Sequence, residues 1–215
     1  MNHWLLRITI ISLFWCPEPA FSQGLDLRIY DAIHDRRNRA LDEAMNSFSV
    51  SVYPLTIAVP VAQVLYGAIA DDKDAYRGAL VTTASLITNT FITYSGKMVI
   101  NRPRPYVSHP QYTPYENDSS PAFPSGHTSY AFTTATNLTL QYRHWWVALP
   151  AYSWAAGVGY SRMHMGAHYP SDVLVGALVG AGSAWLAFKG NQWVKGKQEQ
   201  RRKERLEKAA ELMAD

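Results

Sequence analysis

Residues 44–70 read AMNSFSVSVYPLTIAVPVAQVLYGAIA and contain no aspartate, glutamate, lysine or arginine. Four later stretches lack these charged residues in the same way: 78–96, 119–142, 145–161 and 173–188. About 20 helical residues cross the hydrocarbon core of a bilayer, so the first three stretches are long enough to span it and the last two are marginal. The pattern predicts an all-α, polytopic transmembrane bundle with about five spans.

The composition excludes several classes of protein. The 215 residues are 47% hydrophobic and 17% charged, which excludes a disordered segment, a collagen and a coiled coil. A net charge of +3 without a basic stripe gives no indication of a nucleic-acid partner. The single cysteine, Cys16, excludes a disulfide framework and a cysteine-based metal cluster. We expect no metal and no cofactor, and the sequence does not define an oligomeric state.

Residues 1–22 have the layout of a secretory signal peptide, with a basic start, a short apolar stretch and the small-x-small site Ala20-Phe21-Ser22. A retained N-terminal anchor is the alternative, and it would raise the number of spans to six. The short apolar stretch and the residues Pro17 and Pro19 favour the signal peptide.

Residues 23–48 are predicted to form an amphipathic helix on the membrane surface. Leu25, Ile29 and Ile33 recur at helical spacing among charged residues. An ordinary solvated helix before the first span is the alternative.

The membrane domain is then predicted to cover residues 49–190, followed by a basic tail over 191–215. Threading the spans from an external N-terminus places this tail in the cytoplasm, in agreement with the positive-inside rule. We therefore expect a multi-pass protein of a bacterial inner (cytoplasmic) membrane.

Unusual polar residues gather at the span ends that this topology turns outward. Lys97, Arg104 and Arg162 are cations, and paired arginines suit forked hydrogen bonds to an oxyanion. Ser125 and Gly126 stand where a helix is expected to begin, and backbone N–H groups at a helix start hold anions. These residues predict a phosphate-binding site on the periplasmic or extracytoplasmic side.

Two histidines could supply the chemistry at this site. His168 and Asp172 are four residues apart, so the carboxylate could fix the imidazole tautomer, as a nucleophilic histidine requires. His127 could protonate the leaving oxygen, and a two-step phosphoryl transfer of this kind needs no metal. Arg102 and His164 are expected to support the site or to lie at the interface rather than to react.

The spacing of these residues resembles that of the type 2 phosphatidic acid phosphatase superfamily, which also includes vanadium haloperoxidases and bacterial non-specific acid phosphatases. Three motifs carry the resemblance: Lys97-x6-Arg104-Pro105, Pro124-Ser125-Gly126-His127 and Ser161-Arg162-x5-His168-x3-Asp172. The resemblance implies that His168 forms a phosphohistidine, that Asp172 orients it and that His127 is the general acid. It also implies five ligands of the phosphoryl oxygens: Lys97, Arg104, Ser125, Gly126 and Arg162.

The expected function is hydrolysis of a lipid phosphomonoester or diphosphate at the bilayer surface, with a lipid phosphate and the membrane lipids as partners. The candidate substrates are undecaprenyl diphosphate, phosphatidylglycerol phosphate, phosphatidic acid and lipid A phosphate. The alternatives are a non-specific acid phosphatase, a vanadium haloperoxidase and a non-catalytic membrane protein that binds lipid phosphates. We expect the loop 106–123, between two motifs, to influence substrate preference more than basal activity.

Overall fold

The structure, a computed structural model, describes residues 20–214, and every regular element in that range is a helix. The helices are, in chain order, α2 (Ala20–His34), α3 (Arg39–Val50), α4 (Val52–Ala70), α5 (Lys73–Ile100), α6 (Pro105–Ser108), α7 (Gly126–Tyr142), α8 (Trp145–His164) and α9 (Pro170–Ala214). The all-α prediction is confirmed for these residues. The signal peptide predicted for residues 1–22 lies outside the described range, except that residues 20–22 are part of α2.

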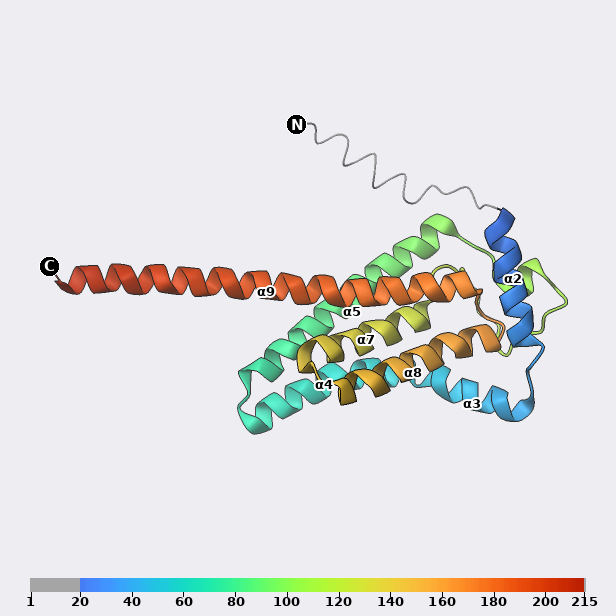
Figure 1. The fold of residues 1–215 in the computed structure, drawn as a ribbon, viewed down its shortest axis with the longest axis horizontal. Helices are drawn as coiled ribbons and strands as arrows, with labels where there is room; N and C mark the ends of the chain where they lie inside the picture. The colour runs from blue at the N-terminus through green and yellow to red at the C-terminus, as the bar shows by residue number, and fades with distance from the viewer. Residues whose placement is uncertain (1–19, 215) are drawn as a thin grey trace, which may run out of the picture.

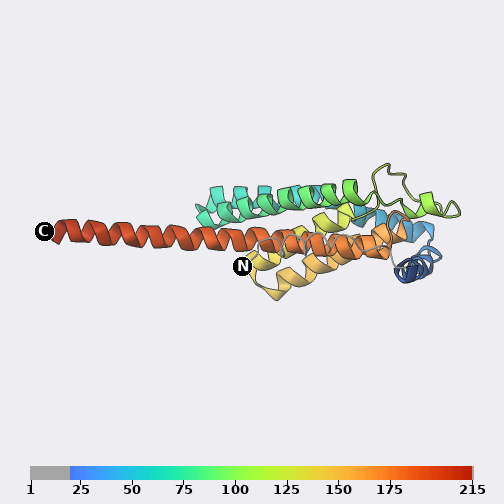
Figure 2. The same cartoon turned by 90° about the horizontal axis from the view of Figure 1, so that it is seen from above.

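The long helices α4, α5, α7, α8 and α9 form a bundle (Figure 1). α7 lies at its centre, because it contacts each of the other four. α2 lies across one end of the bundle, and α9 continues far beyond the other helices at the opposite end (Figure 2). The two ends of the bundle are therefore built differently, and only one of them is covered by α2.

Polar side chains fill the interior of the bundle, while large apolar side chains point outward. Asn89 of α5 donates a hydrogen bond to Ser129 of α7 at 3.2 Å, and both side chains are buried. Ser85 of α5 donates to Asn137 of α7 at 3.1 Å, again between buried side chains. Phe91, also on α5, is 73% exposed. This arrangement suits helices in lipid, where polar groups need partners inside the protein and the outer surface faces hydrocarbon.

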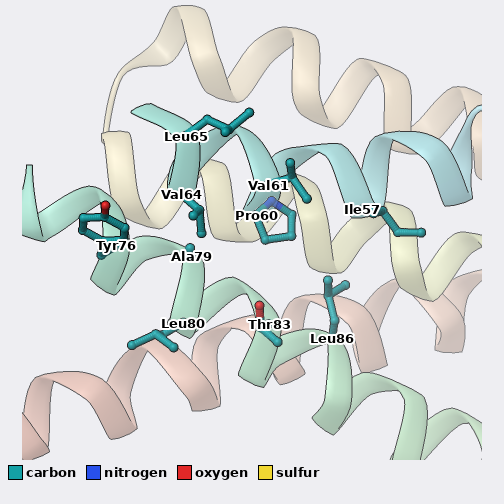
Figure 3. A pocket seen from close by; sticks show the side chains of 10 residues that line it. All are labelled: Ile57, Pro60, Val61, Val64, Leu65, Tyr76, Ala79, Leu80, Thr83 and Leu86. Atoms are coloured by element: carbon teal, nitrogen blue, oxygen red, sulfur yellow. The ribbon is translucent and has the colours of Figure 1, made fainter. Parts of the chain in front are cut away.

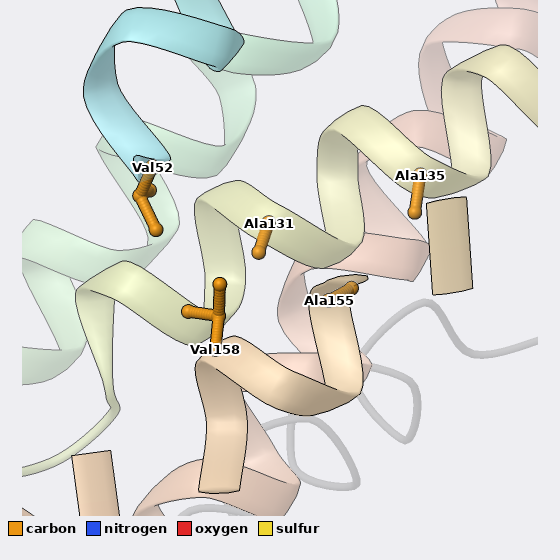
Figure 4. Close-up of a cluster of buried hydrophobic side chains, with 5 residues drawn as sticks. All are labelled: Val52, Ala131, Ala135, Ala155 and Val158. Carbon is orange, nitrogen blue, oxygen red and sulfur yellow. The ribbon is translucent and has the colours of Figure 1, made fainter. Parts of the chain in front are cut away.

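Small residues let α9 approach α7 closely. A Cβ atom added to Gly180 would lie 2.2 Å from the carbonyl oxygen of Ser129, and one added to Gly176 would lie 2.7 Å from that of Ser125. Small buried apolar side chains join α4, α7 and α8 in the same way: Val52, Ala131, Ala135, Ala155 and Val158 (Figure 4). The start of α7 is thus held tightly against the start of α9.

An apolar groove of about 540 Å³ runs between α4 and α5 (Figure 3). Ile57 and Val61 line it from α4, and Leu80 and Leu86 line it from α5. None of its lining side chains carries a charge. The groove can therefore contact lipid chains, but it offers nothing to bind a phosphate.

The charge-free stretches of the sequence correspond to α4, α5, α7, α8 and the first half of α9. Within the described residues, two helical segments are long and apolar enough to cross a membrane by length and composition: Arg39–Ala70 and Pro170–Ala209. The polar interior lowers the mean hydropathy of the other helices. The count of five spans therefore stays a prediction.

The stretch 23–48, predicted as one amphipathic helix, belongs to two helices. α2 ends at His34, and Asn38 begins α3 by accepting a hydrogen bond from the backbone N–H of Leu41 at 3.0 Å. Leu25, which the prediction placed on the apolar face, is 61% exposed. α9 also continues through the predicted domain boundary at residue 190 without a break.

Candidate active site

His168 lies in the turn between α8 and α9, and Asp172 lies in the first turn of α9. The Asp172 carboxylate accepts a hydrogen bond through Oδ2 from the backbone N–H of Tyr169 at 2.9 Å, as the third residue of a helix does in a capping box. The same Oδ2 lies 3.6 Å from His168 Nδ1, which has no hydrogen-bond partner in the described part of the chain. The predicted pair is adjacent in space, at a distance longer than a hydrogen bond.

Arg102 holds the other side of the Asp172 carboxylate. Its Nη1 donates to Asp172 Oδ1 at 2.6 Å and to Ser171 Oγ at 2.7 Å, and its Nη2 donates to Asp26 Oδ2 at 2.9 Å. Asp26, on α2, also accepts from the backbone N–H of Ser171 at 2.8 Å. The guanidinium lies over the ring of Tyr169, 4.2 Å from its centroid. A chain of ion pairs thus runs from Asp26 on α2 through Arg102 to Asp172, which lies beside His168.

Arg104 and Lys97 face the loop 106–123. Arg104 donates through Nε to the carbonyl oxygen of Ser120 at 2.8 Å and through Nη2 to Asp118 Oδ2 at 2.6 Å. Lys97, in the last turn of α5, donates to the carbonyl oxygen of Pro121. Arg104 Nη1 lies 3.5 Å from His168 Nε2. The structure therefore brings a predicted phosphate ligand next to Nε2 of the predicted nucleophile.

Arg162 and His127 complete the cluster from α8 and α7. Arg162 donates through Nη1 to Ser49 Oγ at 2.6 Å, and its Nε is buried without a partner among the described residues. The ring of His127 packs edge-on against Tyr53, with 5.0 Å between centroids. The backbone carbonyl oxygen of Arg162 accepts the N–H of His168 at 3.2 Å, so Arg162 also holds the turn that carries His168.

Ser125 and Gly126 lie at the start of α7, as the sequence predicted. The backbone N–H of Ser125 donates to the carbonyl oxygen of Asp172 at 3.0 Å, which joins the starts of α7 and α9. A Cβ added to Gly126 would have only Lys97 Cε within reach, at 4.0 Å. The start of α7 beside Lys97 is therefore open to a ligand.

The structure gives supporting contacts to one further histidine. His164, fully buried, contacts Asp42 Oδ1 through Nε2 at 2.8 Å, and Arg37 holds the same carboxylate through two nitrogens, at 3.1 and 3.2 Å. A different histidine, His144, stacks on Trp146 at the start of α8, far from this contact in the sequence.

All eight residues predicted for the site lie at the end of the bundle covered by α2. Sequence reasoning missed two partners of this set, Ser49 and Asp118, and it missed Asp26, which contacts the supporting residue Arg102. Asp26 and Ser49 are distant in sequence from the arginines that they contact, so no local pattern signals them. Asp118 lies in a loop already marked by its position between two motifs.

The environment keeps the His168 ring neutral. Burial lowers the pKa of His168 well below its usual value, and the positive charges of Arg104, Arg162 and Lys97 lower it further. A neutral imidazole has a lone pair for attack on phosphorus. The nitrogen of this ring that faces Arg104 is Nε2, 3.5 Å from Nη1.

The depressed pKa of His168 predicts a pH dependence of stability. Below the ordinary histidine pKa of 6.5, the unfolded chain binds a proton at His168 that the folded protein does not bind, so the free energy of unfolding falls as the pH falls. The loss approaches about 1.4 kcal/mol per pH unit for this single group. The melting temperature in detergent should fall as the pH is lowered from 7 to 5.5, which is roughly the window below the ordinary histidine pKa. We expect this fall to be larger for the wild type than for His168→Asn. Equal drops in the two proteins would contradict this assignment.

The sequence is similar to a known protein family and to a curated relative. A family model described as the PAP2 superfamily matches residues 78–195, which is more than half of the chain. The chain is 28% identical over 170 residues to the undecaprenyl-diphosphatase BcrC of Bacillus subtilis, covering 77% of this chain and 83% of that protein.

Two solved structures share the fold. Aquifex aeolicus LpxE aligns with a TM-score of 0.67 and 24% identity, over 77% of this chain and 95% of that one. The first transmembrane PAP2-type phosphatidylglycerolphosphate phosphatase from Bacillus subtilis aligns with a TM-score of 0.66 and 23% identity, over 92% of this chain and 94% of that one.

Proposed function

The chain belongs to the PAP2 superfamily and is a membrane lipid phosphatase, and we propose that it acts through a phosphohistidine at His168. The observation that carries this proposal is the position of the His168 ring. Nδ1 faces the Asp172 carboxylate at 3.6 Å, and Nε2 faces Arg104 at 3.5 Å. One nitrogen is thus placed to keep its proton, and the other is placed beside a cation that would hold a phosphoryl group.

In the first step, His168 Nε2 attacks phosphorus, the bond to the leaving oxygen breaks, and His127 gives that oxygen a proton. In the second step, water attacks the phosphohistidine, His127 takes the water proton, and inorganic phosphate leaves. Asp172 holds the Nδ1 proton throughout and stabilises the positive charge on the ring.

The cations stabilise the charge on the phosphoryl oxygens during both steps, with Lys97, Arg104 and Arg162 as ligands. The backbone N–H group of Gly126 adds a donor from the start of α7, beside Ser125. His127 lies within range of the charges of Arg104 and Arg162, so the bound phosphoryl dianion would supply the negative charge that lets this histidine carry its proton.

We place the site on the periplasmic face of the inner membrane. The basic part of α9 projects from the opposite end of the bundle, and basic segments favour the cytoplasmic side. A substrate anchored in lipid reaches such a site at the bilayer surface. Undecaprenyl diphosphate is the first candidate, because the BcrC similarity extends over most of both chains.

Phosphate release by the detergent-purified protein tests the proposal. The substrates are undecaprenyl diphosphate, phosphatidylglycerol phosphate, phosphatidic acid, a lipid A phosphate and p-nitrophenyl phosphate, each with EDTA present. We expect release from at least one lipid, unchanged by EDTA and absent in His168→Asn. Equal rates on p-nitrophenyl phosphate would favour a non-specific acid phosphatase. No histidine-dependent release from any substrate would favour a protein that only binds lipid phosphates.

A further inference from the structure

A short segment of the loop 106–123 occupies the cations that the proposed function assigns to phosphate. Arg104 Nη2 donates to Asp118 Oδ2 at 2.6 Å and to Ser120 Oγ at 3.1 Å, and Arg104 Nε donates to the Ser120 carbonyl oxygen at 2.8 Å. Lys97 donates to the carbonyl oxygen of Pro121. Residues 118–121 therefore cover both cations.

The hydrogen bonds of Arg104 leave it no free donor. A guanidinium has five N–H groups. Nε and Nη2 supply three, all directed at Asp118 and Ser120. Nη1 supplies the other two, directed at the carbonyl oxygen of Ala167 at 3.0 Å and at His168 Nε2 at 3.5 Å. A phosphoryl oxygen can gain a direct bond to Arg104 only if one of these partners leaves.

Asp118 is the partner best placed to leave. Its side chain is 40% exposed, whereas Arg104 is 3% exposed. Ala167 belongs to the tight turn that holds His168, so its carbonyl oxygen is fixed. The Asp118 carboxylate, in contrast, belongs to an exposed loop. It is held by the ion pair with Arg104 and by a hydrogen bond from the Ser120 backbone N–H.

Asp118 also carries the charge that a phosphoryl group would replace. Burial alone would raise the pKa of the Asp118 carboxyl, but the hydrogen bond from the Ser120 backbone and the charge of Arg104 outweigh it, so the pKa is lowered. Its negative charge is felt at Lys97 and at Arg162 as well. An anion is therefore already present in the cation cluster before substrate arrives.

We propose that Asp118 is an internal anion that holds Arg104 until the phosphoryl group of the substrate takes its place. This inference rests on the proposed function, because it needs Arg104 to be a phosphate ligand. Phosphate binding is then coupled to release of residues 118–121 from the cations. The apparent affinity for phosphate is lowered by the fraction of molecules in which Asp118 occupies Arg104.

The cost of moving Asp118 away from Arg104 is the same for every ligand that replaces it. A phosphomonoester or a diphosphate brings two or more negative charges and recovers this cost by its attraction to the cations. A phosphodiester brings one charge, equal to the one that it displaces, and gains much less. The preference for phosphomonoesters and diphosphates therefore comes from the cations, and Asp118 lowers the apparent affinity for all of these ligands by the same factor.

The test is inhibition by inorganic phosphate in Asp118→Asn, which removes the charge and keeps the size of the side chain. We expect the inhibition constant for phosphate to fall by about threefold to tenfold. Asp118→Ala, which also removes the hydrogen bond, should lower it at least as far. Activity on a phosphodiester relative to a monoester should stay unchanged in both variants, because both ligands displace the same carboxylate.

Glu116→Gln is the matched control. It removes one negative charge from the same loop, and no hydrogen bond or ion pair of Glu116 with Arg104 is present in the described structure. We expect its inhibition constant to change by less than about twofold. An equal fall in Glu116→Gln would mean that general loop charge, and not occupation of Arg104, sets the affinity. An unchanged or raised inhibition constant in Asp118→Asn would mean that Asp118 only positions Arg104.

Hydrogen exchange on the wild type gives a second test that needs no variant. The Ser120 N–H donates to Asp118 Oδ1 at 2.8 Å, so displacement of the carboxylate by phosphate should speed its exchange. Slower or unchanged exchange across residues 118–121 would overturn the inference. Absence of any His168-dependent activity in the wild type would instead overturn the proposed function. A failure of the inference about Asp118 can therefore be told apart from a failure of the proposed function.

Discussion

Replacing His168 by asparagine should lower kcat by at least about 10⁴-fold on every substrate of the enzyme, because no other described side chain is placed to attack phosphorus. His168 Nε2 is the nitrogen beside Arg104, and the buried ring is neutral and therefore nucleophilic. Rapid acid-free quenching with a radiolabelled substrate should trap an acid-labile phosphoenzyme in the wild type and none in His168→Asn. A labelled His168→Asn protein would show that another residue is the nucleophile.

His127→Gln is the comparison that separates the two histidines. A general acid matters most when the leaving oxygen is a poor leaving group, and its loss costs about 10² to 10⁴-fold in such cases. We therefore expect a large loss on a lipid alkyl phosphate and a much smaller loss on p-nitrophenyl phosphate. The loss in His168→Asn should not depend on the leaving group. Equal losses for both leaving groups in His127→Gln would contradict the role of His127 as the acid.

The sequence predicts the features of this site that depend on local spacing. His168 and Asp172 are four residues apart across a helix start, and Ser125 and Gly126 precede a helix, so their positions follow from helix geometry. The contact between Asp26 and Arg102 joins residues 76 positions apart, and it forms only because α2 crosses the end of the bundle. Long-range packing of this kind has no periodic signal in one sequence.

The sequence carries a local signal for the start of α3. Asn38 follows a run of charged residues and precedes Arg39 and Leu41, a pattern typical of a helix start, and in the structure it caps α3. The apolar spacing of Leu25 and Ile29 led instead to a single helix over this stretch. Capping chemistry marks the boundary here, because the Asn38 side chain satisfies a backbone N–H at the start of α3.

The second large effect is expected at Arg102, which the sequence placed in a supporting role. Asp172 is fully buried, and Arg102 is the cation bonded to its carboxylate in the described structure. Arg102→Gln would leave a buried carboxylate without a counter-charge, a change that costs about 3 to 5 kcal/mol in comparable cases. The protein should melt at a markedly lower temperature, or the Asp172 carboxyl should take up a proton.

Either response would affect catalysis through His168. A protonated Asp172 cannot stabilise the charge that forms on the ring during attack, so kcat should fall by at least about 100-fold while KM changes little. Raising the pH should restore part of the activity of Arg102→Gln, because it returns the carboxylate to its charged form. A kcat loss that is independent of pH would show that Arg102 acts only on the fold.

Asp26→Asn is the matched control for Arg102. It removes the outer carboxylate of the chain but leaves the 2.6 Å contact between Arg102 and Asp172 in place, so we expect a loss of less than about tenfold in kcat. Because the three residues share one chain of contacts, the effect of Asp26→Asn should nearly vanish once Arg102 is replaced. Full additivity in the double variant would mean that α2 and Asp172 are independent, and that Arg102 does not transmit the position of α2 to the catalytic histidine.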